Sequence, residues 1–446
     1  MLEARAGSGG VRYSPGYCNY VLGVLCLGYV FNSMDRSVLG VLLESIKEQF
    51  NASDTALCLL GGISFALFYA VMGIPLAALA DRFNRRNLLA ICISAWSLMT
   101  ALCGAATSFL ILLLARIGTA VGESGGSPPS HSLIADYFPV SRRATALSVY
   151  ALAIPIGGAL GIFLGGWFNE FYGWRMAFFL VGLPGILVGL LVRYTVQEPP
   201  RGHADQASAD MAAAKAPQLL EALKFLWSRK SFRHLTMAAG THSFVWYSGS
   251  NWNAAFFMRS HDLGSGETGT YLSIFQFIGI IGTFLGGYLS DRISTRRNDR
   301  RWYLWVPGIA CLVMVPLQWV AYLSPNLSLV MALFAVLMIL ASLFFGPSFA
   351  MTQALATLRT RAVAISILLF MQTLIGMGLG PLFVGMISDA LESTAGDDSL
   401  SFAMAIVGFF NVWAALHYFL GARVLRQDLA ATEALLKSVA EPGEPR

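Results

Sequence analysis

Long apolar runs, each interrupted by a short polar segment, dominate this chain of 446 residues. A helix needs about 20 mostly apolar residues to cross a bilayer, because each residue advances the helix by about 1.5 Å. By this measure the pattern predicts twelve membrane-spanning helices. The expected spans are residues 17–42, 57–80, 88–107, 109–138, 144–168, 174–196, 232–257, 267–290, 303–323, 327–355, 362–388 and 399–424.

Composition supports this prediction. The chain is 56% hydrophobic and only 12% charged, whereas soluble domains carry about 25% charged residues. We therefore expect an all-α polytopic membrane protein. The six cysteines show no CxxC or CxxH spacing, and buried Cys behaves as a small hydrophobe. The sequence thus predicts no disulfide framework, no metal site and no cofactor.

The basic residues are distributed unevenly between the two sides of the predicted spans. One side carries 25 of the 30 Lys and Arg residues, whereas the other carries Lys47, Arg175 and Arg259; Arg36 and Arg116 lie within spans. The positive-inside rule then places both termini in the cytoplasm. The short loops favour a bacterial inner membrane. Because the net charge of +5 belongs to the cytoplasmic face, we expect no nucleic-acid site.

A polar linker divides the spans into six and six. The pattern predicts a cytoplasmic tail over 1–16, a bundle over 17–196, a cytoplasmic linker over 197–231, a second bundle over 232–425 and a cytoplasmic tail over 426–446. The second half of the linker is amphipathic, which is typical of a helix lying on the inner membrane surface.

The two halves carry matching motifs, which indicates duplication of a six-span unit. LADRFNRR at 79–86 and LSDRISTRR at 289–297 place Asp81 and Asp291 210 residues apart. RATALS in the first half likewise matches RAVAIS in the second. Three glycines recur at an offset of 219 residues: Gly157, Gly161 and Gly166 match Gly376, Gly380 and Gly385.

These features resemble the major facilitator superfamily of secondary transporters, through the Asp-Arg loops, the long linker and the glycine-lined spans 5 and 11. Within it, NSMDRSVLG in span 1 and ARIGTAVGESGGSPPSHSLIADYFP in span 4 look like the spinster family of lipid and sphingolipid transporters. The resemblance implies two pseudo-symmetric six-helix bundles around a cavity that opens to each side in turn. It also implies functional roles for Asp35, Arg36, Arg116 and Glu123.

By the same resemblance, the loops after spans 2 and 8 act as cytoplasmic gates. A carboxylate there can pair with arginines or with a helix N-terminus and stabilise one conformation. The arginines also fix the topology of the loops, and we expect both roles. The expected gating residues are Asp81, Arg82, Arg85, Arg86, Asp136, Arg143, Asp291 and Arg292.

Spans 1 and 4 carry the buried charges. Arg116 and Glu123 are seven residues apart, about 10.5 Å along one helix face, so each should meet a partner on another span. Spans 1 and 4 run in opposite directions, so Asp35 and Arg116 reach similar depths. We expect these two to pair while Glu123 faces the cavity. Arg36 points about 100° away from Asp35 and needs a separate partner.

An ionisable group at this depth costs roughly 2.5 to 3.5 kcal/mol and is usually functional. We therefore expect Asp35 and Glu123 to load and release protons. The alternative is a static charge cluster that holds spans 1 and 4 together. Gly125, Gly126, Pro128 and Pro129 predict a break in span 4 that can act as a hinge. His131 is a candidate proton carrier, although a structural histidine at the inner end fits its position better.

The second-half spans offer neutral polar groups among aromatic residues instead of embedded charges. This contrast suggests that the first half handles charge and the second an apolar body, although aromatic residues also serve packing and lipid contact. The candidate cavity residues are His242, Trp246, Asn251, Asn253, Gln276 and Gln372.

The sequence thus predicts a monomeric, proton-coupled transporter of a small amphipathic molecule, lysolipid or sphingoid-like, surrounded by membrane lipids. A sugar or drug exporter of the same superfamily is the alternative. A ligand sensor on this fold fits less well, because the 35-residue linker and 20-residue tail leave no room for an output domain. The chain has no Walker loop, nucleophile elbow or metal-ligand cluster, which argues against an enzyme.

Overall fold

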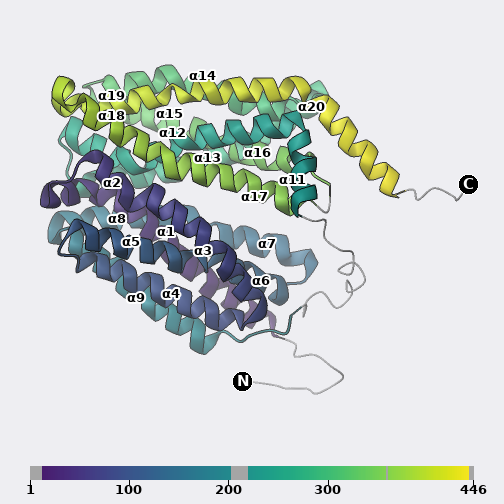
Figure 1. Cartoon of the computed structure of the whole chain (residues 1–446), viewed down its shortest axis with the longest axis horizontal. Helices are drawn as coiled ribbons and strands as arrows, with labels where there is room; N and C mark the ends of the chain where they lie inside the picture. Colours follow the sequence, from purple (N-terminus) through teal and green to yellow (C-terminus); the bar gives the residue numbers. More distant parts are fainter. Residues whose placement is uncertain (1–12, 202–218, 358–359, 441–446) are drawn as a thin grey trace, which may run out of the picture.

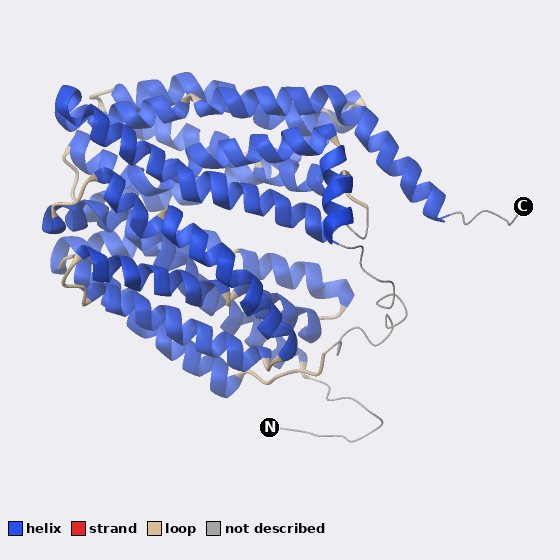
Figure 2. Cartoon of the chain, viewed as in Figure 1, coloured by secondary structure: helices blue, strands red, loops and turns tan. Residues whose placement is uncertain are grey.

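The computed structural model describes residues 13–201, 219–357 and 360–440, and these residues form only helices and their connections (Figure 2). The all-α prediction is therefore confirmed. Nine helical segments of the described chain are long and apolar enough to cross a bilayer. One of them, Val363–Leu435, covers two predicted spans, and the nine do not include the first helix of either half. The helices are thus consistent with twelve spans.

The first half of the chain forms the N-terminal bundle, in which several predicted spans consist of two helices in line. Its helices are α1 (Pro15–Phe50), α2 (Asp54–Gly61), α3 (Ile63–Arg82), α4 (Arg85–Gly104), α5 (Phe109–Ser124), α6 (Ser127–Tyr137), α7 (Val140–Ala151), α8 (Ala153–Tyr172) and α9 (Trp174–Thr195).

The second half forms the C-terminal bundle, preceded by a short helix where the linker was expected to be amphipathic. Its helices are α11 (Leu219–Ser228), α12 (Lys230–His261), α13 (Ser265–Arg297), α14 (Trp302–Leu323), α15 (Leu327–Ser342), α16 (Phe345–Ala354), α17 (Arg361–Met371), the π-helix η1 (Gln372–Leu379), α18 (Gly380–Ala395), the 3-10 turn η2 (Gly396–Asp398), α19 (Ser399–Gly408) and α20 (Phe410–Ala440).

Local sequence determines where many of these helices begin and end. The side chains of Ser53, Asn84 and Ser108 accept backbone N–H groups of the first turns of α2, α4 and α5, as N-cap residues do. Asn51 and Asp262 end α1 and α12 in the left-handed conformation, with φ of 48° and 52°, which Asn and Asp tolerate well. The first helix of each half therefore ends in the same way.

The two bundles lie side by side, the N-terminal one in purple and blue and the C-terminal one in green and yellow (Figure 1). They meet at the end that holds the loops after α1 and α12, which we call the distal end. They diverge toward the end where the chain termini and the linker lie, which we call the linker end (Figure 1). The hydrogen bonds that join the bundles among the described residues lie at the distal end and between α8 and α13.

The glycine repeat marks equivalent helix crossings in the two halves. A Cβ atom at Gly161 on α8 would collide with the carbonyl oxygen of Met34 on α1. A Cβ atom at Gly380 on α18 would collide with the carbonyl oxygen of Phe244 on α12. In each bundle, the fifth predicted span therefore packs directly on the backbone of the first, which requires glycine at the crossing.

Candidate functional site

Asp35 and Arg116 form a buried ion pair between α1 and α5, and each is 2% exposed. Arg116 Nη1 donates to Asp35 Oδ1 at 2.9 Å, and the Thr100 hydroxyl on α4 donates to Oδ2. Arg116 Nε also donates to the carbonyl oxygen of Leu60 at 3.3 Å. Both carboxylate oxygens of Asp35 therefore have partners, and the structure brings together the two residues that their depths had matched.

Glu123 lies nearer the linker end than Arg116, and it lines a small cavity of about 20 Å³ within the N-terminal bundle. It is 1% exposed, and its Oε2 accepts from Nε of Arg36. Glu123 Oε1 is buried and has no hydrogen-bond partner in the described part of the chain. The ion pair forms because the Arg36 side chain is long enough to reach from α1 to the second charge of α5.

Arg36 thereby obtains a partner separate from that of Asp35, as the angle between the two side chains requires. Its guanidinium also lies over the ring of Tyr69 on α3, 4.6 Å from the ring centroid. Two adjacent residues of α1 thus hold both charges of α5. The four charges sum to zero, so a proton gained or lost at either carboxylate unbalances the whole group.

The predicted break in span 4 lies directly below these charges. Helix α5 ends at Ser124 and α6 begins at Ser127, so Gly125 and Gly126 form the interruption. Pro128 and Pro129 lie in the first turn of α6, where their missing N–H groups leave no intrahelical bond unmade. The two glycines and the two prolines that follow them therefore favour this interruption. Its movement as a hinge stays a prediction.

His131 is exposed on α6, and its Nδ1 atom lies 2.9 Å from the carbonyl oxygen and 3.2 Å from the hydroxyl of Ser127. Its ring meets the ring of Tyr150 edge-on at 5.3 Å. The side chain is thus held by its own helix and by α7 while remaining accessible.

A cavity of about 80 Å³ lies among α12, α13, α14 and α15 and reaches Ile162 of the N-terminal bundle. Of the predicted cavity residues, Trp246, Asn253 and Gln276 line it. Most of the remaining wall is apolar, and its polar atoms come from a few amide, hydroxyl and indole groups. Such a wall suits an apolar body with sparse polar recognition.

The other three predicted cavity residues do not line this cavity. Asn251 donates to the carbonyl oxygen of Tyr247 within its own helix, and Gln372 is buried in η1. His242 is 1% exposed, and its Nδ1 and Nε2 atoms each lie 2.9 Å from an oxygen, that of the Asn411 amide and the carbonyl oxygen of Ala341. Periodicity gives the face of a helix on which a residue lies but not the neighbour that covers it, so it could not place these three residues.

Instead, His242 supports a cavity residue that the sequence did not single out. Asn411 Nδ2 donates to Gln318 Oε1 at 3.0 Å, and Gln318 lines the cavity. The chain from His242 through Asn411 therefore fixes the orientation of the Gln318 amide. No sequence signal indicated this link, because its members lie on three different helices.

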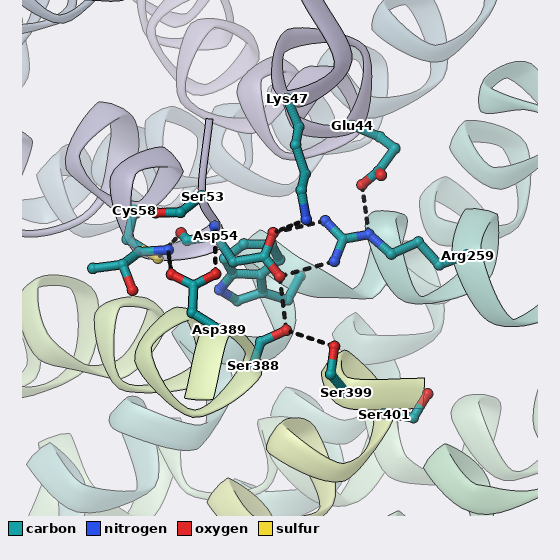
Figure 3. A network of polar contacts seen from close by, with 12 residues as sticks. Glu44, Lys47, Ser53, Asp54, Cys58, Arg259, Ser388, Asp389, Ser399 and Ser401 are labelled. Atoms are coloured by element: carbon teal, nitrogen blue, oxygen red, sulfur yellow. Dashed lines mark hydrogen bonds and ion pairs between the residues drawn. The ribbon is translucent and has the colours of Figure 1, made fainter. Parts of the chain in front are cut away.

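The distal end holds a second polar cluster that our sequence-based assignment did not include, the distal latch, formed by Glu44, Lys47, Asp54, Arg259, Ser388 and Asp389 (Figure 3). Arg259 on α12 donates to Glu44 Oε2 at 2.8 Å and to both oxygens of Asp54 at 2.8 and 2.9 Å. Ser388 on α18 donates to Asp54 Oδ2 at 2.7 Å. Asp54, which is 2% exposed, thus binds two helices of the opposite bundle.

Two carboxylates cap helix N-termini across the bundle boundary. Asp389 on α18 accepts the backbone N–H groups of Asp54 and Thr55, each at 2.8 Å, at the start of α2 (Figure 3). Glu170 on α8 accepts the N–H of Gly266 at 2.6 Å, at the start of α13. A carboxylate there is stabilised by the free N–H groups and by the helix dipole.

These two caps are related by the internal repeat. Glu170 and Asp389 are 219 residues apart, the offset of the glycines, and each lies four residues beyond the last matched glycine, Gly166 or Gly385. Those glycines pack against the same helix starts, at the carbonyl oxygens of Ser265 and Asp54. Extending the repeat by one helical turn could therefore have found the caps from sequence.

At the linker end, the ion pairs of the first predicted gating loop remain within the N-terminal bundle. Arg85, 1% exposed, pairs with Asp136 and with Glu198, the latter at 2.7 Å. The backbone N–H of Arg86 donates to Glu198 at 2.9 Å, and Arg143 donates to the carbonyl oxygen of Ala135 at 2.7 Å. These contacts connect residues of the N-terminal bundle with one another and with the segment that follows α9.

The second gating loop behaves likewise. Asp291 accepts the hydroxyl of Tyr303 at 2.5 Å, and Arg292 donates to Tyr288; all four residues belong to the C-terminal bundle. Arg82 is exposed, and the side chain of Asp81 lies outside the described part of the chain. In this conformation the described contacts of the predicted gates stay on one side of the boundary.

Asp299, in the loop between α13 and α14, binds Arg301 at 2.8 Å and Arg426 of α20 at 3.0 Å. Hydrogen bonds from Arg301 are the main cause that lowers the pKa of Asp299 to about 2. Asp299 therefore stays ionised at neutral pH and ties this loop to the last helix of its own bundle.

The comparison with protein families matches residues 25–381 to the model described as the Major Facilitator Superfamily. An MFS-type efflux pump of Mycolicibacterium smegmatis is 32% identical over 94% of this chain and 96% of its own length. The sphingosine-1-phosphate transporter SPNS2 of Danio rerio is 28% identical over 94% of this chain and 87% of its own length.

Among solved structures, a bacterial homologue of the human lysosomal transporter spinster, in an inward-facing and unoccupied conformation, superposes with a TM-score of 0.85. It is 33% identical and covers 93% of this chain and 99% of its own. A D-xylose-proton symporter, 20% identical with a TM-score of 0.66, shares the fold; 90% of this chain and 97% of the symporter are covered.

Proposed function

This chain belongs to the major facilitator superfamily and is a transporter of the spinster type, and we propose that it couples proton movement to transport of a small amphipathic molecule. In this proposal the two bundles expose a shared site to each side of the membrane in turn. The observation that carries it is two ion pairs between α1 and α5. Asp35 and Arg116 are both buried, whereas in the second pair Glu123 is buried and the side chain of Arg36 is 32% exposed.

The coupling follows from the balance of these four charges. Protonation of Asp35 or Glu123 would release an arginine, since arginine itself does not lose its proton. A released guanidinium can bind an anionic headgroup, and deprotonation restores the ion pair. Proton and substrate would then bind and leave together, the proton on the carboxylate and the headgroup on the arginine that it releases.

The C-terminal bundle would hold the apolar part of the substrate. Its cavity carries aromatic and aliphatic side chains and a few neutral polar groups, including the Gln318 amide supported by Asn411. The relatives that match this chain include a sphingosine-1-phosphate transporter. A lysolipid or sphingoid-like molecule, which joins a charged headgroup to a hydrocarbon chain, fits both bundles.

In this proposal the linker end is cytoplasmic, which fits the bias of Lys and Arg toward it. The distal latch then closes the outer face, and the divergence of the bundles corresponds to an inward-facing conformation. Opening to the outside would require the contacts of Arg259 and the two caps to break. When those contacts break, the predicted gating loops on the cytoplasmic side would form contacts between the two bundles.

Reconstituted flux with an imposed pH gradient tests this proposal. We expect Asp35→Asn and Glu123→Gln to lose pH-dependent uptake of a lysolipid or sphingoid phosphate while remaining folded in detergent. Asp397→Asn, at an exposed distal acid, is the matched control. Proton-driven flux at the wild-type rate in both variants would refute proton coupling through these residues.

A second candidate is export of drug-like molecules, favoured by the similarity to a mycobacterial efflux pump over nearly the full chain. The two candidates differ in headgroup dependence. For lipid transport, free headgroups and lysolipids should both compete with a labelled lysolipid. For drug export, cationic apolar dyes should compete whereas anionic headgroups should not.

A further inference from the structure

A small cavity lies on the linker side of Glu123, within the N-terminal bundle. It measures about 20 Å³ and is lined by Glu123, the helix break and the hydroxyl-bearing residues Ser127, Ser130, Tyr29 and Tyr150, among others. A cavity of this size has room for about one water molecule, provided that two to four polar groups can bind it.

One lining group has a specific need for such a partner. Oε1 of Glu123 is buried and makes no hydrogen bond to the described residues, whereas Oε2 is held by Arg36. A buried carboxylate oxygen without a partner is costly, and an ordered water commonly satisfies such an atom. The cavity hydroxyls provide the remaining partners of that water.

The cavity also leads to the surface. Ser127 lines it, and the same residue meets Nδ1 of His131, whose side chain is exposed. When Nδ1 carries no proton, the Ser127 hydroxyl at 3.2 Å can donate to it; when it carries one, the Ser127 carbonyl oxygen at 2.9 Å accepts it. Both tautomers of the ring therefore have a partner, which suits a group that passes protons.

We propose that a water molecule in this cavity links Glu123 Oε1 to the Ser127 hydroxyl and His131, forming the route by which the coupled proton leaves toward the linker end. This inference rests on the proposed proton coupling and identifies its exit. Each step transfers one proton: Glu123 to the water, the water to Ser127, and Ser127 to Nδ1, while Nε2 of the imidazolium releases its proton to solvent.

The other charged and titratable groups around Glu123 do not offer this exit. Arg36 and Arg116 remain protonated, Asp35 is bound at both oxygens, and Tyr69 lies against Arg36. Tyr29 and Tyr150 stack on each other at 4.6 Å and form a side of the cavity. Ser127 is the cavity hydroxyl that contacts the exposed His131.

Two variants test the route. Ser127→Ala removes the relay hydroxyl, and His131→Ala removes the exposed carrier. We expect each to lower pH-gradient-driven uptake in proteoliposomes about tenfold or more, since positioned proton transfer commonly contributes at least that much. Substrate counterflow, which needs no net proton release, should stay within about twofold of wild type. Ser124→Ala is the control, because its hydroxyl bonds to Val121 in the same helix.

Chemical rescue separates proton transfer from a structural role. Added imidazole should restore net uptake to His131→Ala, where solvent can reach the vacated position, and should leave Ser127→Ala unchanged. A loss that imidazole does not rescue, or a loss of counterflow in parallel with net uptake, assigns these residues to structure and overturns the route.

The same experiment separates this inference from the proposed function. If Glu123→Gln loses proton-driven uptake while Ser127→Ala and His131→Ala keep it, the exit route is wrong and proton coupling stands. If Glu123→Gln keeps proton-driven uptake as well, the coupling itself is wrong.

Discussion

Polar contacts at the distal end cross between the bundles, whereas the described ion pairs at the linker end stay within one bundle. Arg259 reaches from α12 to Glu44 and Asp54 on the opposite side. Arg85 likewise has two acidic partners, Asp136 of its own bundle and Glu198 of the segment that follows α9. Arginine–carboxylate ion pairs therefore join the two bundles at the distal end, whereas at the linker end they stabilise the structure of a single bundle.

The difference has a consequence for energetics. Removing a contact within one bundle destabilises every conformation equally and lowers the free energy of unfolding. Removing a contact between bundles destabilises only the conformation that contains it and shifts the populations. Variants at the linker end should therefore change the free energy of unfolding, whereas variants at the distal end should change the populations of the conformations.

The largest expected effect is on stability, from Arg85→Met. This residue is 1% exposed, and its loss removes the cation that pairs with the buried Asp136 and the half-buried Glu198. Breaking a buried pair costs roughly 3 to 5 kcal/mol. We expect a clearly lower thermal midpoint in detergent and an unchanged separation of the distal ends. Exposed Arg82→Met is the control.

A distal separation that changes in Arg85→Met as much as in an Arg259 variant would contradict the contrast between the ends. Spin labels at Glu48 on α1 and Asp398 beside α19, both exposed, report that separation.

Arg259→Met should have the next largest effect. We expect it to change the populations of the closed and open distal ends and not the free energy of unfolding. Its loss leaves Asp54 buried without its main partner, at a cost of roughly 3 kcal/mol, or about a hundredfold in the ratio of closed to open distal ends. The distances between the two labels should broaden toward longer values. Arg175→Met is the matched control, because that distal arginine binds Gln49 and Ala106 within its own bundle.

The smallest expected effects come from the two caps. Asp389→Asn and Glu170→Gln each weaken one cross-bundle cap, a loss of about 1 kcal/mol apiece. Because the caps act on different helices, α2 and α13, their effects on the distal distance distribution should add in the double variant. Glu392→Gln, at an exposed acid one turn beyond Asp389, should change nothing. Strong non-additivity would show that the caps act as one unit.

Much of this architecture could be predicted from the sequence, because a bilayer restricts the structures that a chain can adopt within it. A bilayer requires long apolar helices with internally satisfied backbones, so spans, class and family followed from hydropathy and motifs. The repeat of glycines predicted a duplicated six-span unit, and in the structure its members Gly161 and Gly380 lie at equivalent helix crossings. The pairing of Asp35 with Arg116 followed from counting depth along antiparallel helices.

The sequence was least informative where a contact depends on side-chain reach or on the rotation of a helix. Glu123 was expected to face a cavity and lines a small one, but its partner Arg36, which reaches it from α1, was not identified from the sequence. His242 was expected to line the C-terminal cavity but lies behind it, supporting Gln318 through Asn411. Hydrophobic periodicity cannot distinguish such positions, because both lie on the inward face of their helix.

By itself, then, the sequence determined an all-α membrane protein of the major facilitator type, its duplicated halves and the charges of spans 1 and 4. Only the tertiary structure decided which carboxylate oxygen has no hydrogen-bond partner among the described residues and which polar residues form contacts between the bundles. The physical reason is that composition and period fix what a segment is and how deep it lies. The partner of a side chain depends on differences of a few ångströms in how far that side chain extends toward a helix that is distant in sequence.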